Sequence, residues 1–237
     1  MANENEKAAA AQASMRFVND GNVVGLGSGS TSAYAVRFLA ERVKAGLKVR
    51  GIPTSREIEQ LARSAGIPLT TFEKIQQIDV TIDGADEFDP QLNLIKGGGG
   101  ALLHEKIVAS ASSILVIITD SSKQVPVLGK FPLPVEVIPF AEPIIIKRVE
   151  ALGAKVIPRR FPDGSPFITD EHNHILDCHF GQIPDPPALA RQLGAMPGVV
   201  EHGLFIGMAG VVLVAKGSDV QELRVPHPSR FSKGGNF

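Results

Sequence analysis

The chain has 237 residues, a hydrophobic content of 43% and a formal net charge of -1. This length is enough to bury a full hydrophobic core, either as one large domain or as a domain with a smaller companion. Because acidic and basic residues are interspersed and aromatic residues are few, with one tyrosine and no tryptophan, neither nucleic acid nor an anionic membrane surface is an expected partner.

The first predicted element is a helix over residues 3–19, where helix-forming residues precede a stop at Asp20-Gly21. The chain begins with an acidic, alanine-rich stretch, which is unlike a basic targeting segment. No apolar run is long enough for a membrane span. We therefore expect a cytoplasmic protein without a membrane partner.

Strands and helices then alternate along the chain. Residues 23–26 predict a strand that runs into a glycine-rich turn and a helix over residues 33–43. Further strands are expected at residues 48–53, 79–83 and 114–119, and further helices at residues 55–65 and 101–113. This alternation is typical of an α/β fold with a parallel sheet, and the apolar strands indicate burial on both faces.

A stiff connector, Phe131-Pro132-Leu133-Pro134, marks a change of pattern and the start of a smaller α+β unit. Its strands are expected at residues 135–138, 155–157, 167–169 and 174–177, and its helices at residues 144–152 and 187–193. The apolar strand at residues 211–215 is expected to rejoin the first sheet, which would make the small unit an insertion. The single cysteine, Cys178, is interpreted as core packing in a reducing compartment. Residues 226–237 are expected to form a mobile tail.

The first candidate site segment is Gly25-Leu26-Gly27-Ser28-Gly29-Ser30-Thr31. Backbone N–H groups and hydroxyls between a strand and a helix can converge on an anion, so the segment predicts a phosphate cradle. A dinucleotide-binding turn fits poorly, because Ser30 or Ser32 replaces its third glycine and no acidic residue ends the second strand. We therefore expect no nicotinamide cofactor. A plain turn with a serine cap remains an equal alternative.

The second candidate segment is Thr81-Ile82-Asp83-Gly84-Ala85-Asp86-Glu87, which ends an apolar strand where open α/β sheets bind their ligands. Two neighbouring carboxylates raise each other's proton affinity, which prepares acid and base groups near neutral pH. An Asx turn at Asp83-Gly84 is one alternative. A divalent metal site ranks third, because no partner histidines are evident.

The third segment is Lys96-Gly97-Gly98-Gly99-Gly100, which leads into a helix with His104 and Glu105. Four glycines cost much backbone entropy, which favours close approach to a ligand over a plain linker. Glu105 is a candidate base, with an ordinary helix glutamate as the alternative. Adjacent helical residues point about 100° apart, so only one of His104 and Glu105 should face the site. Lys123, after the strand at residues 114–119, is a candidate phosphate or oxyanion ligand or else a solvated surface lysine.

Taken in order, these segments resemble the ribose-5-phosphate isomerase A family. The likeness includes Asp120-Ser121-Ser122-Lys123, residues 128–137, Thr169-Asp170, Ile175-Leu176-Asp177, residues 197–200 and residues 203–205, and covers nearly the whole chain except its last residues. It implies a Rossmann-like parallel-sheet large domain from residues 1–130 and 206–237, with an inserted ferredoxin-like domain at residues 131–205. It also implies a homodimer or homotetramer.

The resemblance further implies interconversion of D-ribose 5-phosphate and D-ribulose 5-phosphate through an enediolate, in the non-oxidative pentose phosphate pathway, without metal or organic cofactor. Glu105 falls at the family's proton-acceptor position, and Asp83, Asp86 and Lys96 complete the candidate catalytic residues. The expected substrate-binding residues are Ser28, Gly29, Ser30, Thr31, Asp83, Gly84, Ala85, Asp86, Lys96, Gly97, Gly98, Gly99 and Lys123.

In the expected mechanism, Glu105 carries the proton between C2 and C1 while Asp83 moves hydroxyl protons and Asp86 assists sugar binding. Lys96 and the N–H groups of the glycine loop stabilise the oxyanion. A sugar-phosphate sensor is the competing function of another class. Such sensors usually add a helix-turn-helix, for which the single helix before the first strand leaves no room.

Overall fold

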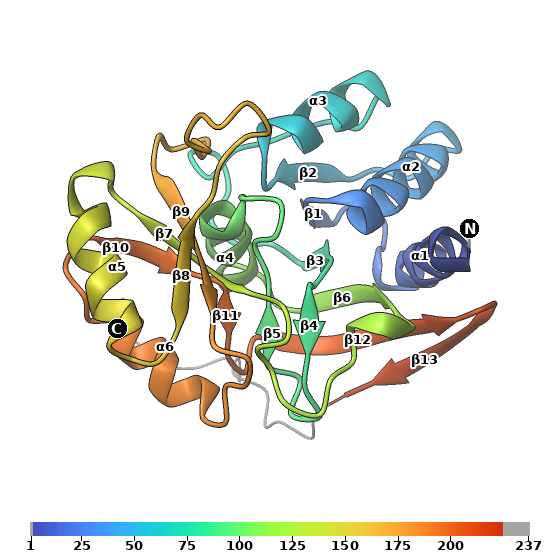
Figure 1. Ribbon diagram of the computed structural model, residues 1–237. Helices are drawn as coiled ribbons and strands as arrows, with labels where there is room; N and C mark the ends of the chain where they lie inside the picture. The colour runs from blue at the N-terminus through green and yellow to red at the C-terminus, as the bar shows by residue number, and fades with distance from the viewer. Residues whose placement is uncertain (1, 225–237) are drawn as a thin grey trace, which may run out of the picture.

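Six strands form the first sheet of the computed structural model, which describes residues 2–224 (Figure 1). Their order is β13-β12-β6-β3-β1-β2. The strands are β1 (Val23–Leu26), β2 (Arg50–Pro53), β3 (Val80–Asp83), β6 (Leu115–Asp120), β12 (Ala209–Lys216) and β13 (Asp219–Leu223). All neighbours pair in parallel except β13, which is antiparallel to β12. The α/β prediction is therefore confirmed, and β12 rejoins this sheet as expected.

Helices cover one face of this sheet, and a helix with a small sheet covers the other. The first face carries α1 (Ala2–Ser14), α2 (Ser30–Lys44) and α3 (Arg56–Ser64). The second carries α4 (Leu102–Ser110) and a three-stranded sheet of β4 (Glu87–Phe88), β5 (Leu94–Ile95) and β11 (Leu204–Phe205). Along β6, Val116 and Ile118 pack toward the first face whereas Leu115 and Ile117 pack toward the second. Burial on both faces is thus confirmed.

A second sheet lies beside the first and has the strand order β10-β7-β9-β8, with every neighbouring pair antiparallel (Figure 1). Its elements, in chain order, are β7 (Leu133–Val137), α5 (Glu142–Glu150), β8 (Lys155–Pro158), β9 (His174–His179), α6 (Pro186–Gly194) and β10 (Val199–His202). Cys178 is fully buried in the core of this unit, which confirms its interpretation as a packing residue. Burial raises the pKa of its thiol and disfavours the reactive thiolate.

Several local features differ from the sequence-based expectations. The expected strand at residues 167–169 is absent: Ile168 makes only an isolated bridge with His174. The first helix gives way after Ser14 to a 3-10 turn, Met15–Phe17, whose Met15 carbonyl accepts a hydrogen bond from Arg42. Two more 3-10 turns are Ser121–Lys123 and Pro139–Ala141.

Within residues 2–224 no helix is both long and apolar enough to cross a bilayer. The tail expected at residues 226–237 lies outside the described residues.

Candidate active site

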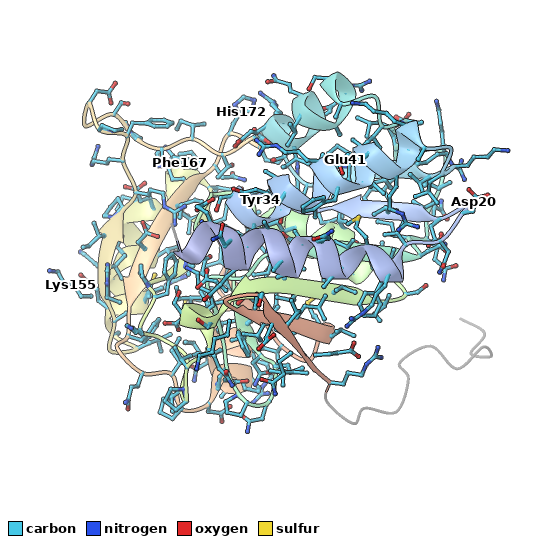
Figure 2. All side chains as sticks on the ribbon, turned by 90° about the vertical axis from the view of Figure 1, so that its right-hand side faces the viewer. Asp20, Tyr34, Glu41, Lys155, Phe167 and His172 are labelled. Atoms are coloured by element: carbon cyan, nitrogen blue, oxygen red, sulfur yellow. The ribbon has the colours of Figure 1, made fainter. Side chains whose placement is uncertain are left out.

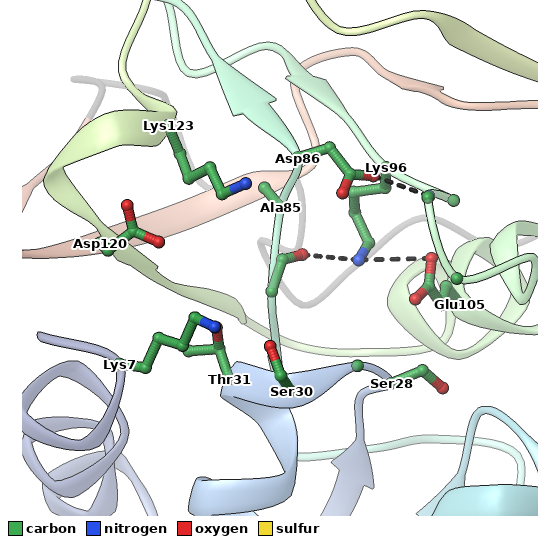
Figure 3. Close-up of a pocket in the computed structure, with 15 residues that line it drawn as sticks. Lys7, Ser28, Ser30, Thr31, Ala85, Asp86, Lys96, Glu105, Asp120 and Lys123 are labelled. Carbon is green, nitrogen blue, oxygen red and sulfur yellow. Dashed lines mark hydrogen bonds and ion pairs between the residues drawn. The ribbon is translucent and has the colours of Figure 1, made fainter. Parts of the chain in front are cut away.

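A cavity of about 200 Å³ opens at the edge of the first sheet where β1, β3 and β6 end (Figure 3). All three strands are parallel, so the residues that follow them meet at one edge. The lining residues are Lys7, Ser28, Gly29, Ser30, Thr31, Gly84, Ala85, Asp86, Lys96, Gly97, Gly98, Gly99, Glu105, Asp120 and Lys123. The fold thus brings together all four candidate segments, and every candidate site residue except Asp83 lines the cavity.

Lys96 joins the two carboxylates that the sequence singled out. Its ammonium Nζ lies 3.0 Å from Asp83 Oδ2 and 3.3 Å from Glu105 Oε2, and it donates to the Gly84 carbonyl at 2.6 Å. Only 3% of the Lys96 side chain is exposed. Burial on its own would lower the pKa of Lys96, but the Asp83 and Glu105 carboxylates outweigh it and the pKa is raised. Lys96 therefore remains a cation within the site.

Glu105 lies in the first turn of α4, which contacts β3 of the first sheet and both β7 and β10 of the second. Burial raises the pKa of its carboxyl to about 8; Lys96 opposes this rise, while Asp83 and Asp86 add to it. A carboxyl with such a pKa gains and loses protons near neutral pH, as a general base must.

His104 points away from this cavity, as the angle between neighbouring helical residues predicts. Its Nε2 lies 2.8 Å from Glu171 Oε1. It also borders a separate cavity of about 530 Å³ on the α3 side of α4. Glu105 is therefore the member of this pair that reaches the candidate active site.

Asp83 lies beneath the cavity and does not line it, although the sequence predicted that it would bind the substrate. Its side chain is fully buried, and its Oδ1 accepts hydrogen bonds from the N–H groups of Ser28 at 3.1 Å and Gly84 at 2.7 Å. The turn after β1 closes over it because residue 27 is glycine: a Cβ there would lie 2.1 Å from Asp83 Oδ1. Asp83 is connected to the cavity through Lys96. The spacing of residues along the chain cannot show that Asp83 lies below the cavity wall.

The glycine loop, residues 97–100, packs closely against the protein itself. Gly98 donates its N–H to Asp86 Oδ2 at 2.8 Å, and a Cβ at Gly98 would lie 2.6 Å from Asp86 Oδ1. Gly97 and Gly100 have φ values of +97° and +86°, which favour glycine. At Gly99 a Cβ would meet no other atom within 4 Å, and φ is not in the left-handed region. The close approach of the loop is therefore to three protein groups, namely Leu102 at Gly97, Asp86 at Gly98 and Phe167 at Gly100. Burial raises the pKa of Asp86.

The other end of the cavity is suited to an anion. Helix α2 begins at Ser30, and its N-cap, Gly29, has no side chain to accept hydrogen bonds from the first turn. Uncapped N–H groups and the positive end of the helix dipole attract anions. Lys123 also lines this cavity, together with Lys7 from α1.

Two residues that line the cavity were not predicted from the sequence as site residues. Lys7 was not singled out, and Asp120 was named only as part of the segment Asp120-Ser121-Ser122-Lys123. Lys7 comes from α1, far along the chain from the other segments, and no local motif surrounds it. Its side chain is 18% exposed and pairs with Glu4 at 2.7 Å. Asp120 ends β6 and accepts the Ser122 N–H at 2.9 Å. The clue to Asp120 was its position at the end of a buried strand.

Within residues 2–224 no group of three or more His, Cys, Asp or Glu side chains is arranged to hold a metal ion.

The chain is similar to proteins of known family. The sequence model of ribose 5-phosphate isomerase A (phosphoriboisomerase A) matches residues 50–219. A Synechococcus sp. protein named ribose-5-phosphate isomerase A is 52% identical over 221 residues, which are 92% of this chain and 96% of that protein.

Two solved structures show the same overall fold. A D-ribose-5-phosphate isomerase in complex with phospho-erythronic acid matches with a TM-score of 0.92 and 39% identity, over 95% of this chain and 100% of that chain. The ribose 5-phosphate isomerase A of Methanocaldococcus jannaschii matches with a TM-score of 0.90 and 40% identity, over 94% of this chain and 99% of its own.

Proposed function

Because the chain belongs to the ribose-5-phosphate isomerase A family, we propose that it interconverts D-ribose 5-phosphate and D-ribulose 5-phosphate through an enediolate, with Glu105 as the base. The observation that carries this proposal is the position of Glu105. It lines the cavity with its pKa raised to about 8, and it lies 3.3 Å from a buried ammonium. A proton acceptor beside a fixed positive charge suits the formation of an enediolate.

In the proposed reaction, the open-chain aldose binds with C1 and C2 beside Glu105. Glu105 takes the proton from C2, the electron pair forms the C1–C2 double bond, and the negative charge passes to O1. Lys96 stabilises that charge with an ammonium that is already in place. Glu105 then returns its proton to C1, which completes the ketose.

A hydroxyl proton must also leave O2 and reach O1 during this reaction. Asp83 is our candidate for assisting this transfer, and it acts through Lys96, 3.0 Å away, because it does not line the cavity itself. The Lys96 ammonium gives a proton to O1, and the resulting amine takes the proton from O2, while the Asp83 carboxylate holds the Lys96 nitrogen in place. Asp86 is our candidate for binding a sugar hydroxyl. Its carboxylate accepts the Gly98 N–H. This N–H group is therefore already engaged and is not free to bind the oxyanion.

The phosphate group is proposed to bind at the opposite end, among Ser30, Thr31, Lys7 and Lys123. The uncapped start of α2 and the two lysines support this placement. Phospho-erythronic acid, the ligand of the D-ribose-5-phosphate isomerase described above, supports it further. Its carboxylate has the planar shape and charge of an enediolate, and its phosphate is a second anion. The cavity offers one cationic end for each.

We also propose that residues 131–205 form a ferredoxin-like domain inserted in a Rossmann-like domain of residues 1–130 and 206–237. The order β7-α5-β8-β9-α6-β10, a β-α-β-β-α-β pattern, supports this division. From the family resemblance we propose a cytoplasmic homodimer or homotetramer that acts in the non-oxidative pentose phosphate pathway without metal or organic cofactor.

The test is a coupled assay of chelator-treated protein with D-ribose 5-phosphate, in which Glu105→Gln is compared with the wild type. We expect the variant to fold and bind but to lose about 100-fold or more in kcat, because a positioned base contributes about 10² to 10⁴. Glu57→Gln, at an exposed position on α3, is the matched control and should keep wild-type kcat. Near-normal turnover by Glu105→Gln would exclude the base assignment. A wild type that binds the sugar phosphate without turnover would favour the sensor.

A further inference from the structure

The glycine loop of the site accepts hydrogen bonds from an arginine that follows a strand of the second sheet. Arg159 directly follows β8, and its Nη1 donates to the carbonyls of Gly97 and Gly98, each at 3.1 Å. Arg159 is not among the residues that line the cavity. It therefore contacts the backbone that forms the cavity wall without lining the cavity itself.

Asp177 of β9 holds the Arg159 guanidinium in a fixed orientation. Nε donates to Asp177 Oδ2 at 3.0 Å, and Nη2 donates to Asp177 Oδ1 at 2.5 Å. The two side chains are only 13% and 19% exposed. A paired contact of this kind fixes the plane of the guanidinium as well as its position. One edge of the group is thus bound by the second sheet while Nη1 remains directed at the loop.

Phe167 holds the far end of the same loop. Its ring lies 5.6 Å from Arg159 Cζ, and a Cβ at Gly100 would lie 2.5 Å from the ring. Figure 2 shows Phe167 and His172 on the segment that extends from the second sheet toward α3, where Arg56 donates to Asp170. The segment that joins β8 to β9 of the second sheet therefore contacts the glycine loop at both ends.

The loop links three groups of the proposed reaction. Lys96 directly precedes it, Gly98 within it donates to Asp86, and α4 with Glu105 begins two residues after it, beyond the N-cap Ala101. A shift of the loop would alter the distances among these groups together. We infer that Arg159, oriented by Asp177, is a positioning residue for the isomerase site, and that the second sheet sets the geometry of catalysis through it. This inference rests on the proposed function.

A positioning role predicts a selective kinetic effect. The proposed phosphate subsite is built on α1, α2 and the turn Ser121–Lys123, which Arg159 does not contact. Loss of Arg159 should therefore impair turnover and leave the binding of inorganic phosphate unchanged. A merely structural ion pair would change the melting temperature and would not change kcat selectively.

The experiment compares the wild type with Arg159→Met, Arg159→Lys and Arg160→Met. Arg160 is the matched control, because the side chain of this exposed neighbour donates to the Gly164 carbonyl, away from the glycine loop. For each protein we would measure kcat and KM for D-ribose 5-phosphate, competitive inhibition by inorganic phosphate, and the melting temperature.

We expect Arg159→Met to lower kcat about tenfold or more with phosphate inhibition within about twofold of wild type. Arg159→Lys should lower kcat less, since an ammonium keeps the charge and lacks the planar fork. Arg160→Met should match the wild type. If Arg159→Met does not fold, Arg159→Lys decides the question.

Two results would overturn the inference. One is wild-type kcat in the folded Arg159 variants, and the other is a parallel loss of kcat and phosphate binding. A wild type that does not isomerise D-ribose 5-phosphate would instead overturn the proposed function, so the two failures are distinguishable.

Discussion

At the scale of single residues, the electrostatics around Glu105 predict a pH dependence. Burial raises its pKa to about 8, and the base must be ionised to accept a proton. The ionised fraction grows as the pH rises through about 8, so kcat/KM should rise with it and fall on the acid side. We would measure kcat/KM from about pH 6 to about pH 10. A profile that is flat across this range would contradict the assignment.

Asp86→Asn provides a sharper test of the same environment. The charge of Asp86 raises the pKa of Glu105, so removing that charge should lower the pKa and move the acid limb of kcat/KM to lower pH. The rate itself should fall if Asp86 binds the sugar, and the informative quantity is therefore the midpoint of the limb. Asp163→Asn, on an exposed turn, should leave the midpoint unchanged. A midpoint that stays constant or rises in Asp86→Asn would show that the two groups are not coupled.

Lys123→Ala tests the proposed phosphate end. A hydrogen bond to a charged group contributes about 1.5–3 kcal/mol, which corresponds to roughly a tenfold or greater rise in KM. The variant should keep most of kcat, because Lys123 lies at the end of the cavity away from Glu105 (Figure 3). Lys130→Ala, at an exposed position that does not line the cavity, should behave as wild type. Loss of kcat with unchanged substrate affinity would require a catalytic role for Lys123.

At the scale of elements, Glu6 binds α1 to the turns that follow β6 and β12. Its carboxylate accepts the Ser121 N–H at 3.1 Å, the Ser121 hydroxyl at 3.0 Å and the Gly217 N–H at 3.0 Å. Backbone hydrogen bonds, from Gly217 first, lower the pKa of Glu6 and keep it ionised. Lys7 is the next residue on α1, and Lys123 ends the turn that Ser121 begins. Glu6 therefore aligns the two lysines of the proposed phosphate end.

Glu6→Ala should accordingly raise KM for D-ribose 5-phosphate several-fold and change kcat little. It leaves two backbone N–H groups without this acceptor, so we also expect a lower free energy of unfolding. Glu41→Ala, at an exposed position on α2, is the control for removing a helical glutamate (Figure 2). Steady-state kinetics with urea unfolding would measure both effects. A drop in kcat at constant KM would contradict the alignment role.

Elements with strong apolar periodicity were predictable from the sequence, and very short ones were not. β1 was predicted with its bounds as observed, and β6 within one residue at each end, because their side chains are buried on both faces. β4, β5 and β11 have two residues each, too few for any periodicity. The segment at residues 167–169 looks like a strand because Phe167 and Ile168 are apolar. Its position instead follows from the contact of Phe167 with Gly100, which is distant in the chain.

The site was predictable for a related reason. Strand ends and glycine-rich turns identify themselves locally, and parallel pairing brings them to one edge of the sheet. Depth and contacts between distant segments do not follow from such motifs. The burial of Asp83 depends on Gly27 packing over it. Lys7 reaches the cavity from α1, and Arg159 reaches the glycine loop from the segment after β8, so only the tertiary structure reveals them.

At the scale of the whole molecule, the chain leaves the first sheet after β6, builds the second sheet, and returns through β12 (Figure 1). β12 lies between β6 and β13, so the last described part of the chain supplies an interior strand. Its residues Val211, Val212, Leu213 and Val214 are buried on alternating faces of the sheet. The folding of the first sheet thus depends on residues that follow the second sheet in the chain.

A chain shortened to end at Gly207 should therefore fail to fold. Burying each of those four side chains contributes roughly 1.5–3 kcal/mol, together roughly 6–12 kcal/mol, comparable with the usual total stability of about 5–15 kcal/mol. A chain ending at Arg224 keeps every element that the structure describes and should melt cooperatively. Circular dichroism melting curves of the two shortened chains would decide. Cooperative melting of the chain that ends at Gly207 would show that the first sheet is stable without its return strand, and that β12 only covers an edge already formed by β6.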